Sequence, residues 1–509
     1  MRKPPLSAML TLWPLLAVLA WLVSARHASA ATTFEPEAQA PCVRDAQAVG
    51  MPSGDRIFHW IEDIVAFGPR RSGTEANARA AAWVKCQFEA LGLQGVHFHT
   101  APTWFWEASR HSLQVNGFQI DSFPVAFSAV EPGVPNHYAT GPNGLQAEIV
   151  DVGDGRAVDL VGRSVKGKIA LFNLRFEVST AAFLPLMEFL WDPTLSAFNP
   201  QLFVANPYQT NLVSAVKRLM DAGAVGVVGV LADYHESNRY YNEFYRRLEV
   251  TVPGVWVSPG EGARIRTLLK NGRNTQARLD FEARREQVPG RAVVGVLPGR
   301  TSDAVLVTSH HDSVWAGAVE DGSGTASVLA QAQYFASRPD GQLDKTLVFV
   351  TMDSHFSGYQ VHRSFGEKWM GLQAPYKVVA DVTIEHIAKE AVNRGGRLVL
   401  SGQSEVFGIF ESFRAPLTRA LKDAVKRHDL RRTAVLGAHT LCGTVGIPTD
   451  AFACTGGIPT ASFISGPAYL YDEQDTLDKV DRTKLLPVAR VFADFIEAID
   501  RTPSDKIGR

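Results

Sequence analysis

Residues 304–336, AVLVTSHHDSVWAGAVEDGSGTASVLAQAQYFA, contain a strand, two histidines, a glycine-rich turn and a helix in immediate succession. The apolar run 304–309 is typical of a buried strand, and the residues from Thr325 onward are typical of a packed helix. This alternation continues towards the C-terminus and predicts an α/β fold in which helices sandwich a mostly parallel or mixed sheet. Further strands are expected at 346–352, 378–384 and 460–464, and further helices at 415–426 and 485–499.

Polar residues follow the first of these strands, at the edge where ligands gather in parallel sheets. His310 and Asp312 are two residues apart, so their side chains share a face if the strand continues through them. A metal-bound imidazole usually donates its other N–H to a carboxylate, and this pair can therefore be a ligand and its orienting partner. A hydrogen-bonded loop anchor is the alternative interpretation. His311, without a spaced acidic partner, is expected to be a surface or core histidine.

The composition excludes several classes of protein. The chain has 509 residues, of which 46% are hydrophobic, and this is enough for about three domains or one large domain with an insertion. Lys and Arg number 51 against 52 Asp and Glu, so no basic surface for gripping a polyanion is expected. We expect no nucleic-acid partner.

The first thirty residues have the features of a secretory signal. Arg2 and Lys3 precede an uncharged apolar run, 6–23, and Ala28-Ser29-Ala30 supplies the small residues of a cleavage site. The sequence therefore predicts a signal peptide over 1–30 and a secreted or periplasmic protein without a membrane span. An uncleaved N-terminal anchor is the alternative, because the run is nearly long enough to cross a bilayer.

The chain has four cysteines, an even number that suits an oxidising compartment. Proximity in sequence suggests the pairs Cys42–Cys86 and Cys442–Cys454. Buried thiols are the alternative interpretation, whereas a zinc site on these thiols is not expected because none of them lie in CxxC pairs.

Two segments carry a resemblance to a known family. His310-x-Asp312-Ser313 and the following Gly317-Ala318-x-Glu320-Asp321-Gly322-Ser323-Gly324 resemble the signature of secreted zinc-dependent aminopeptidases related to glutamate carboxypeptidase and the transferrin receptor. Phe67-Gly68-Pro69-Arg70, Gly457-Ile458-Pro459 and Asp475-Thr476-Leu477 extend the resemblance along the chain. It implies a zinc-exopeptidase fold over 45–130 and 291–503, with a β-rich α+β protease-associated domain inserted at 145–285.

The resemblance also implies positions for the metal ligands. His310 matches the family's first histidine, while Glu320 and Glu385 stand where the family has aspartates. His355 and Phe356 replace a pair of glutamates, one of which is the family's general base and the other a ligand. Phe356 has no donor atom for zinc, so the ordinary two-zinc centre is not expected.

Two hypotheses follow from these replacements. In the first, one zinc ion is held by His310, Glu320, His355 and Glu385, or His355 is instead the general base. In the second, the pocket is inactive and the protein is a pseudo-peptidase that binds peptides or another protein. Oligomeric state is left open.

Three further residues belong to the predicted site. Asp312 and Asp321 are expected to orient the ligands without binding the ion. Tyr471 stands at the position of the family's late histidine and is a candidate catalytic residue beside His355. His386, next to Glu385, would face away from the site if its strand continued.

The stretch 183–208 is rich in aromatic side chains. It is expected to pack over the inserted domain or onto the peptidase part, with a ligand-gripping lid as the alternative.

Overall fold

The computed structural model describes residues 49–241, 249–272, 275–339, 342–371, 373–438 and 457–508. The predicted signal peptide at 1–30, and with it the cleavage site, lies outside these residues. Cys86 is disulfide-bonded, but the other three cysteines lie outside the described residues, so both pairings stay predictions. No helix in the described part of the chain is both long enough and apolar enough to cross a membrane.

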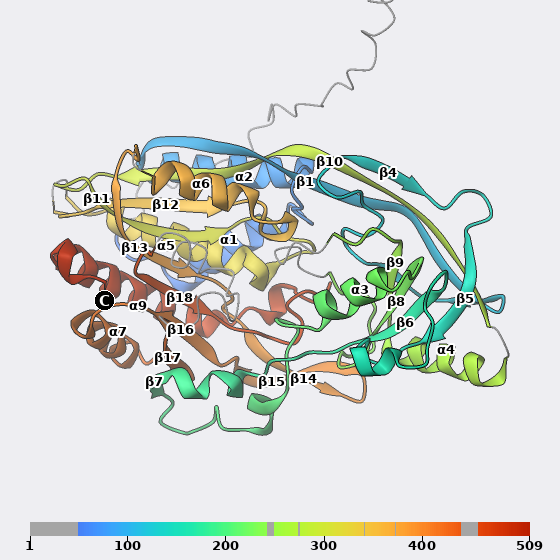
Figure 1. The fold of residues 1–509 in the computed structure, drawn as a ribbon. Helices are drawn as coiled ribbons and strands as arrows, with labels where there is room; N and C mark the ends of the chain where they lie inside the picture. The colour runs from blue at the N-terminus through green and yellow to red at the C-terminus, as the bar shows by residue number, and fades with distance from the viewer. Residues whose placement is uncertain are drawn as a thin grey trace, which may run out of the picture. The chain divides into compact units, whose positions relative to one another are not determined.

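Four parallel strands form the centre of the large sheet (Figure 1). Strand β11 pairs with β12 on one side and with β13 on the other, and β13 pairs with β18. Every residue of β12 and β18 is buried, which explains why these segments are apolar without alternation. The expected mixed α/β fold is confirmed. The bounds are β11 (Asp303–His310), β12 (Thr346–Met352), β13 (Lys377–Ile384) and β18 (Thr460–Ile464).

Helices cover both faces of these strands. Side chains that alternate along a strand pack on opposite faces of the sheet. Leu306 and Val350 lie in the apolar cluster that contains Phe365 of α6. Val307 and Phe349 lie in the large core with α1, α5 and α9. Helix α2 packs on the edge formed by β1 and β10. The bounds are α1 (Gly54–Val65), α2 (Glu75–Ala90), α5 (Gly324–Ala336), α6 (Gln360–Trp369), α7 (Ala415–Arg427) and α9 (Arg482–Arg501).

A long antiparallel ribbon connects the central strands to a second group of strands. β10 (Gln276–Leu297) pairs with β1 (Gln94–Val115) along its length, with β12 near its C-terminal end and with β5 (Leu145–Asp151) near its N-terminal end. The second group continues as β6, β8 and β9, all parallel to β5. Its elements are β6 (Ile169–Leu174), α3 (Leu212–Asp221), β8 (Gly226–Leu231), β9 (Gly254–Val257) and α4 (Pro259–Asn271).

The division into 45–130, 145–285 and 291–503 stays a prediction, as does the identity of the inserted domain. Strand β10 runs through 285–291 without a break. The segment 145–285 also supplies an edge strand, β7 (Met187–Trp191), which pairs with β17 (Thr433–Gly437) of the large sheet. Its aromatic stretch packs there: the rings of Phe183 and Phe410 lie 5.4 Å apart, edge to face. This agrees with the packing interpretation of residues 183–208.

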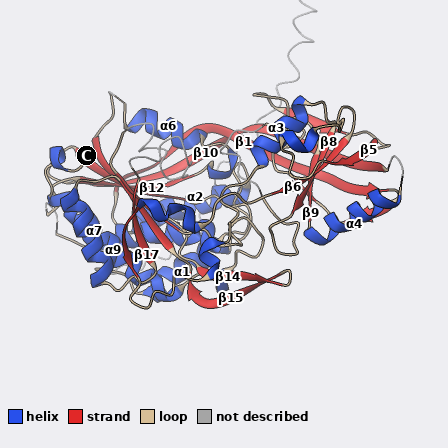
Figure 2. Cartoon of the chain, turned by 60° about the horizontal axis from the view of Figure 1, so that its bottom comes forward, coloured by secondary structure: helices blue, strands red, loops and turns tan. Residues whose placement is uncertain are grey.

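The remaining strands lie at the margins of these sheets. β14 and β15 form a separate two-stranded hairpin (Figure 2), and β16 lies between β18 and β17. The bounds are β2 (Phe118–Ile120), β3 (Phe123–Pro124), β4 (Asn136–Ala139), β14 (Lys389–Arg394), β15 (Arg397–Ser404) and β16 (Phe407–Glu411), with short helical turns η1 (Ala157–Leu160), η2 (Thr180–Leu186), η3 (Pro200–Phe203), η7 (Leu477–Lys479) and η8 (Ser504–Lys506).

Candidate metal centre

Three neighbouring parallel strands bring the candidate ligands to one edge of the sheet. His310 is the last residue of β11, His355 lies in the turn η5 (His355–Ser357) after β12, and Glu385 follows β13 directly. Glu320 comes from the turn η4 (Ala318–Ser323) that precedes α5. Because the carboxyl ends of parallel strands share an edge, residues far apart in sequence meet here.

The loop that carries Glu320 depends on one glycine. Gly317 has φ +59°, and a Cβ at this position would collide with Oγ of Ser313 and with the carbonyl oxygen of Glu320. A side chain here would therefore displace the residue that presents the carboxylate. The turn after β12 is similarly tight, since Ser354 and Tyr359 both have positive φ.

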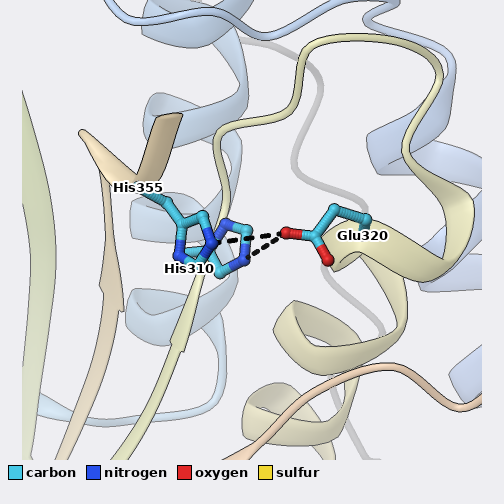
Figure 3. A group of neighbouring side chains, drawn as sticks. All are labelled: His310, Glu320 and His355. Atoms are coloured by element: carbon cyan, nitrogen blue, oxygen red, sulfur yellow. Dashed lines mark ion pairs between the residues drawn. The ribbon is translucent and has the colours of Figure 1, made fainter. Parts of the chain in front are cut away.

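The carboxylate of Glu320 is the meeting point of the cluster (Figure 3). Its Oε1 lies 3.2 Å from Nε2 of His310 and 3.5 Å from Nε2 of His355. Donor atoms of His310, Glu320 and His355 lie within 4.8 Å of one another, as do those of His310, Glu385 and His386. The structure thus brings together the four residues predicted as ligands, while their roles remain predictions.

His386 also enters this cluster, and the expectation that it faces away is wrong. Its Nε2 forms an ion pair with Oε2 of Glu320 and lies 3.8 Å from Oε2 of Glu385. The alternation of side chains fails because the chain leaves the strand: His386 has φ +55°, and β13 ends at Ile384. His386 is the second residue after the strand, and with a left-handed backbone it does not follow the alternation of sides that holds for extended residues.

The candidate donor atoms suit a metal ion because they are buried and because several of them lack a hydrogen-bond partner among the described residues. His310, Glu320, Glu385 and His386 are each at most 3% exposed. Nε2 of His310 and of His386, both carboxylate oxygens of Glu320 and Oε2 of Glu385 make no hydrogen bond of ordinary geometry among the described residues. Buried polar atoms without partners are costly unless another group satisfies them, and nitrogen and carboxylate oxygen are ligands that zinc prefers.

The pKa values of these side chains are shifted because the groups are buried close to one another. Burial disfavours the charged form of His386, but Glu320 outweighs burial and raises the pKa of this imidazole to about 10. Burial also disfavours the Glu320 carboxylate, yet His386 and His310 hold its pKa below the ordinary value. Burial, followed by the Asp321 carboxylate, raises the pKa of Glu385 to about 8. The cluster therefore combines one strongly ionised carboxylate with one that favours its proton.

The two other histidines of the cluster shift in opposite directions. Burial opposes the charge on His310, but the neighbouring carboxylates of Asp312 and Glu320 raise its pKa well above the ordinary value. Burial, followed by repulsion from His310, lowers the pKa of His355 well below it. The ring of His355 also accepts or donates a hydrogen bond at the hydroxyl of Tyr359, 3.0 Å from Nδ1.

Several residues support the ligands without belonging to the donor set. Nδ1 of His310 lies 3.1 Å from the carbonyl oxygen of Asp312 and 3.3 Å from its carboxylate. The carboxylate of Asp321 accepts the backbone N–H of Gly324 at 3.0 Å and that of His386 at 3.4 Å. Both acids thus lie beside the candidate ligands, and their roles as orienting groups stay predictions.

Sequence reasoning missed two buried residues that shape the site. Arg70 is fully buried and donates hydrogen bonds to the carbonyl groups of His311, Ala316 and Gly317. Asp475 accepts the backbone N–H of Glu320. Both residues stand in motifs that supported the family resemblance, which is the signal that could have found them.

At two positions where the resemblance implies a metal ligand in the family, this chain has an aromatic side chain instead. Phe356 and Tyr471 are buried, and their rings lie edge to face at 6.2 Å. The ring of Phe356 also contacts those of His310 at 6.0 Å and His355 at 5.0 Å. Neither aromatic ring offers a carboxylate or an imidazole, so a second zinc site of the family's kind has no support in these residues.

His311, also fully buried, lies beside Thr351, with 3.1 Å between Nδ1 and the hydroxyl.

A comparison with known protein families found a match over part of the chain. Residues 292–355 match the model of peptidase family M28, a range that includes His310, Glu320 and His355. The resemblance to a peptidase family that the sequence indicated is confirmed for that segment. No curated protein sequence matches the chain.

Three solved structures resemble the fold at 17–19% identity. The aminopeptidase from Aneurinibacillus sp. strain AM-1 has a TM-score of 0.57 at 18% identity, over 89% of this chain and 95% of the other. BSAP, a zinc aminopeptidase from Bacillus subtilis, has a TM-score of 0.61 at 17% identity, over 90% and 99%. A peptidase M28 precursor from Shewanella amazonensis SB2B has a TM-score of 0.63 at 19% identity, over 88% and 93%.

Proposed function

Because residues 292–355 match peptidase family M28, we propose that this chain is a zinc-dependent hydrolase of the aminopeptidase type that acts on peptides outside the cytoplasm. The observation that carries the proposal is the buried Glu320 carboxylate, with two imidazole nitrogens 3.2 and 3.5 Å from one of its oxygens. A hydrophobic core does not need such a cluster, because burying charged groups costs free energy unless they are paired or bind a metal.

The donor set suits one zinc ion. His310, Glu320 and Glu385 would hold it, together with at least one further imidazole, from His355 or His386. When bound, zinc polarises a peptide carbonyl and lowers the pKa of a water molecule. The chain's own residues must then position the substrate and accept a proton.

Proton transfer falls to the chain because the family's glutamate base is replaced by His355. In hydrolysis, water adds to the peptide carbonyl carbon, the C–N bond breaks, and the proton lost by water passes to the departing amine. His355 can accept and return this proton, since a ring nitrogen lies 3.5 Å from Glu320 and the hydroxyl of Tyr359 orients the ring.

The test is to measure bound metal and hydrolysis in the same preparation. We expect about one zinc per mature chain and cleavage of N-terminal residues from short peptides, with both lost in His310→Ala and both retained in His311→Ala. His311 is a matched control because it is equally buried and adjacent in sequence. A parent protein without zinc after reconstitution and without hydrolysis would contradict the proposal and support the binding module instead.

The pseudo-peptidase alternative is not favoured. Five ionisable side chains, from His310, Glu320, His355, Glu385 and His386, are buried together, and a pocket that had lost its chemistry would have no reason to retain them.

The proposed location rests on the sequence alone. Cleavage after Ala30 would release a mature chain that begins at Ala31. N-terminal sequencing of the exported protein is expected to return Ala31, and recovery of Met1 or Arg2 would indicate a retained anchor.

A further inference from the structure

The rings of His310 and His355 are stacked face to face. Their centroids are 3.9 Å apart and their planes differ by 13°, and Figure 3 shows the two imidazoles overlapping while both face Glu320. The lone pair of an imidazole nitrogen lies in the plane of its ring, so a well-bound ion lies in that plane too. One ion cannot lie in two parallel planes that are separated by a stacking distance.

The ring of His386 is oriented so that the lone pair of one nitrogen can point at an ion shared with His310, which the stacked ring of His355 does not allow. Its Nδ1 lies 2.8 Å from the carbonyl oxygen of Ser465. A carbonyl oxygen only accepts hydrogen bonds, so Nδ1 carries the proton, and in the neutral ring Nε2 presents its lone pair to Glu320 and Glu385. The hydroxyl of Ser465 donates back to the carbonyl oxygen of His386 at 2.7 Å, which fixes the backbone as well.

His310 is held in the same way. Its Nδ1 lies 3.1 Å from the carbonyl oxygen of Asp312, and therefore in the neutral ring its Nε2 presents a lone pair on the side of Glu320, where a metal ion would lie between them. Donor atoms of His310, Glu385 and His386 lie within 4.8 Å of one another, and Glu320 pairs with both histidines. Two imidazoles and the Glu385 carboxylate thus lie together without His355, and the Glu320 carboxylate lies against both imidazoles.

We infer that His310, Glu320, Glu385 and His386 bind the metal ion and that His355 does not. This inference rests on the proposed function and assigns the roles within its site. His355 packs on a ligand, keeps its hydrogen bond with Tyr359 and remains available for proton transfer. Zinc sites can expand from four to five ligands, so four protein donors do not exclude a water molecule.

X-ray absorption at the zinc edge tests the inference on the unaltered protein. We expect a fit with two imidazoles per zinc ion, and a fit with three would overturn the assignment. This measurement needs no variant and is therefore independent of any folding defect.

Three variants divide the roles between the histidines. His386→Ala is expected to weaken zinc binding by more than about 100-fold, because even the loss of an orienting partner costs 10–100-fold. His355→Ala is expected to retain about one zinc with an unchanged absorption spectrum, while hydrolysis falls by about 100-fold or more. His311→Ala controls for the loss of a buried imidazole, and thermal melting checks that each variant is folded.

The results of these experiments distinguish a failure of the ligand assignment from a failure of the proposed function. Zinc lost in His355→Ala, or retained in a folded His386→Ala, would overturn the ligand assignment while leaving a zinc hydrolase. A parent protein that neither binds zinc nor hydrolyses peptides would instead remove the function on which the assignment rests.

Discussion

The carboxylate of Asp475 accepts the backbone N–H of Glu320 at 2.8 Å. It also accepts the N–H of Val319 at the same distance, so it holds the loop η4 at the residue that presents the central carboxylate. Burial is the main cause that raises the pKa of Asp475, to about 7. A residue distant in sequence thus positions a candidate ligand through the backbone.

Replacing this acceptor should loosen the site. Asp475→Ala leaves two buried N–H groups without a partner, and we expect zinc affinity to fall about 10–100-fold, as for other groups that orient metal ligands. Competition with a chelator measures the affinity. The exposed Asp478→Ala, three residues along, is the control, and an unchanged affinity in Asp475→Ala would show that the loop is held by other contacts.

Gly317→Ala should disturb the same loop by steric conflict. Besides the strain of a positive φ, the added Cβ meets Ser313 and Glu320, so we expect a loss of stability of roughly 2 kcal/mol or more together with a loss of zinc. Gly92→Ala is the matched control, because Gly92 has φ +83° and a Cβ added there would meet no atom within 4 Å. Equal destabilisation of both variants, measured by denaturant unfolding, would refute the role assigned to the loop contacts.

Arg70 is expected to be essential for stability. Its guanidinium donates to five carbonyl groups, those of Ile64, Gly68, His311, Ala316 and Gly317. Arg70→Met leaves these acceptors without their donor, so we expect a loss of at least about 3 kcal/mol. Arg71→Met, at a partly exposed neighbour whose ion pair with Glu107 spans 3.6 Å, should cost less than about 1 kcal/mol. Chemical denaturation of both variants tests the difference.

Asp381 should make stability depend on pH. Burial raises its pKa from 3.8 to about 7, against the hydrogen bonds from Thr383 and Thr308. Between these values the folded protein retains a proton that the unfolded chain has lost, so stability falls as the pH rises from about 4 to 7, on the order of 1 kcal/mol per unit. Asp381→Asn cannot ionise at this position, so its stability should lack this dependence on pH.

Urea unfolding at several pH values measures the effect. We expect the stability of Asp381→Asn relative to the parent to improve steadily between pH 5 and 7 and then to level off. Asp505→Asn, at an exposed residue, is the control for net charge. A difference between Asp381→Asn and the parent that does not vary with pH would contradict the assigned ionisation.

The order of elements was predictable from the sequence because a buried parallel strand must be apolar on both faces and a packed helix must be periodic. The strands at 304–309, 346–352, 378–384 and 460–464 were expected within one or two residues of their ends. The positions of His310, Glu320, His355 and Glu385 at one edge followed from the same rule, since parallel strands align their carboxyl ends. These features depend on local pattern and on chain direction, both of which the sequence contains.

Only the tertiary structure decided how the side chains of the site are turned. His386 enters the cluster because a single residue adopts φ +55° after β13, and period-two alternation gives no indication of such a departure. The stacking of His355 on His310, and the contacts of Asp475 and Arg70 with the loop around Glu320, join segments that are far apart in the chain. The sequence determined which donors reach the edge of the sheet, whereas ring orientation depends on packing and hydrogen bonds that exist only in the folded chain.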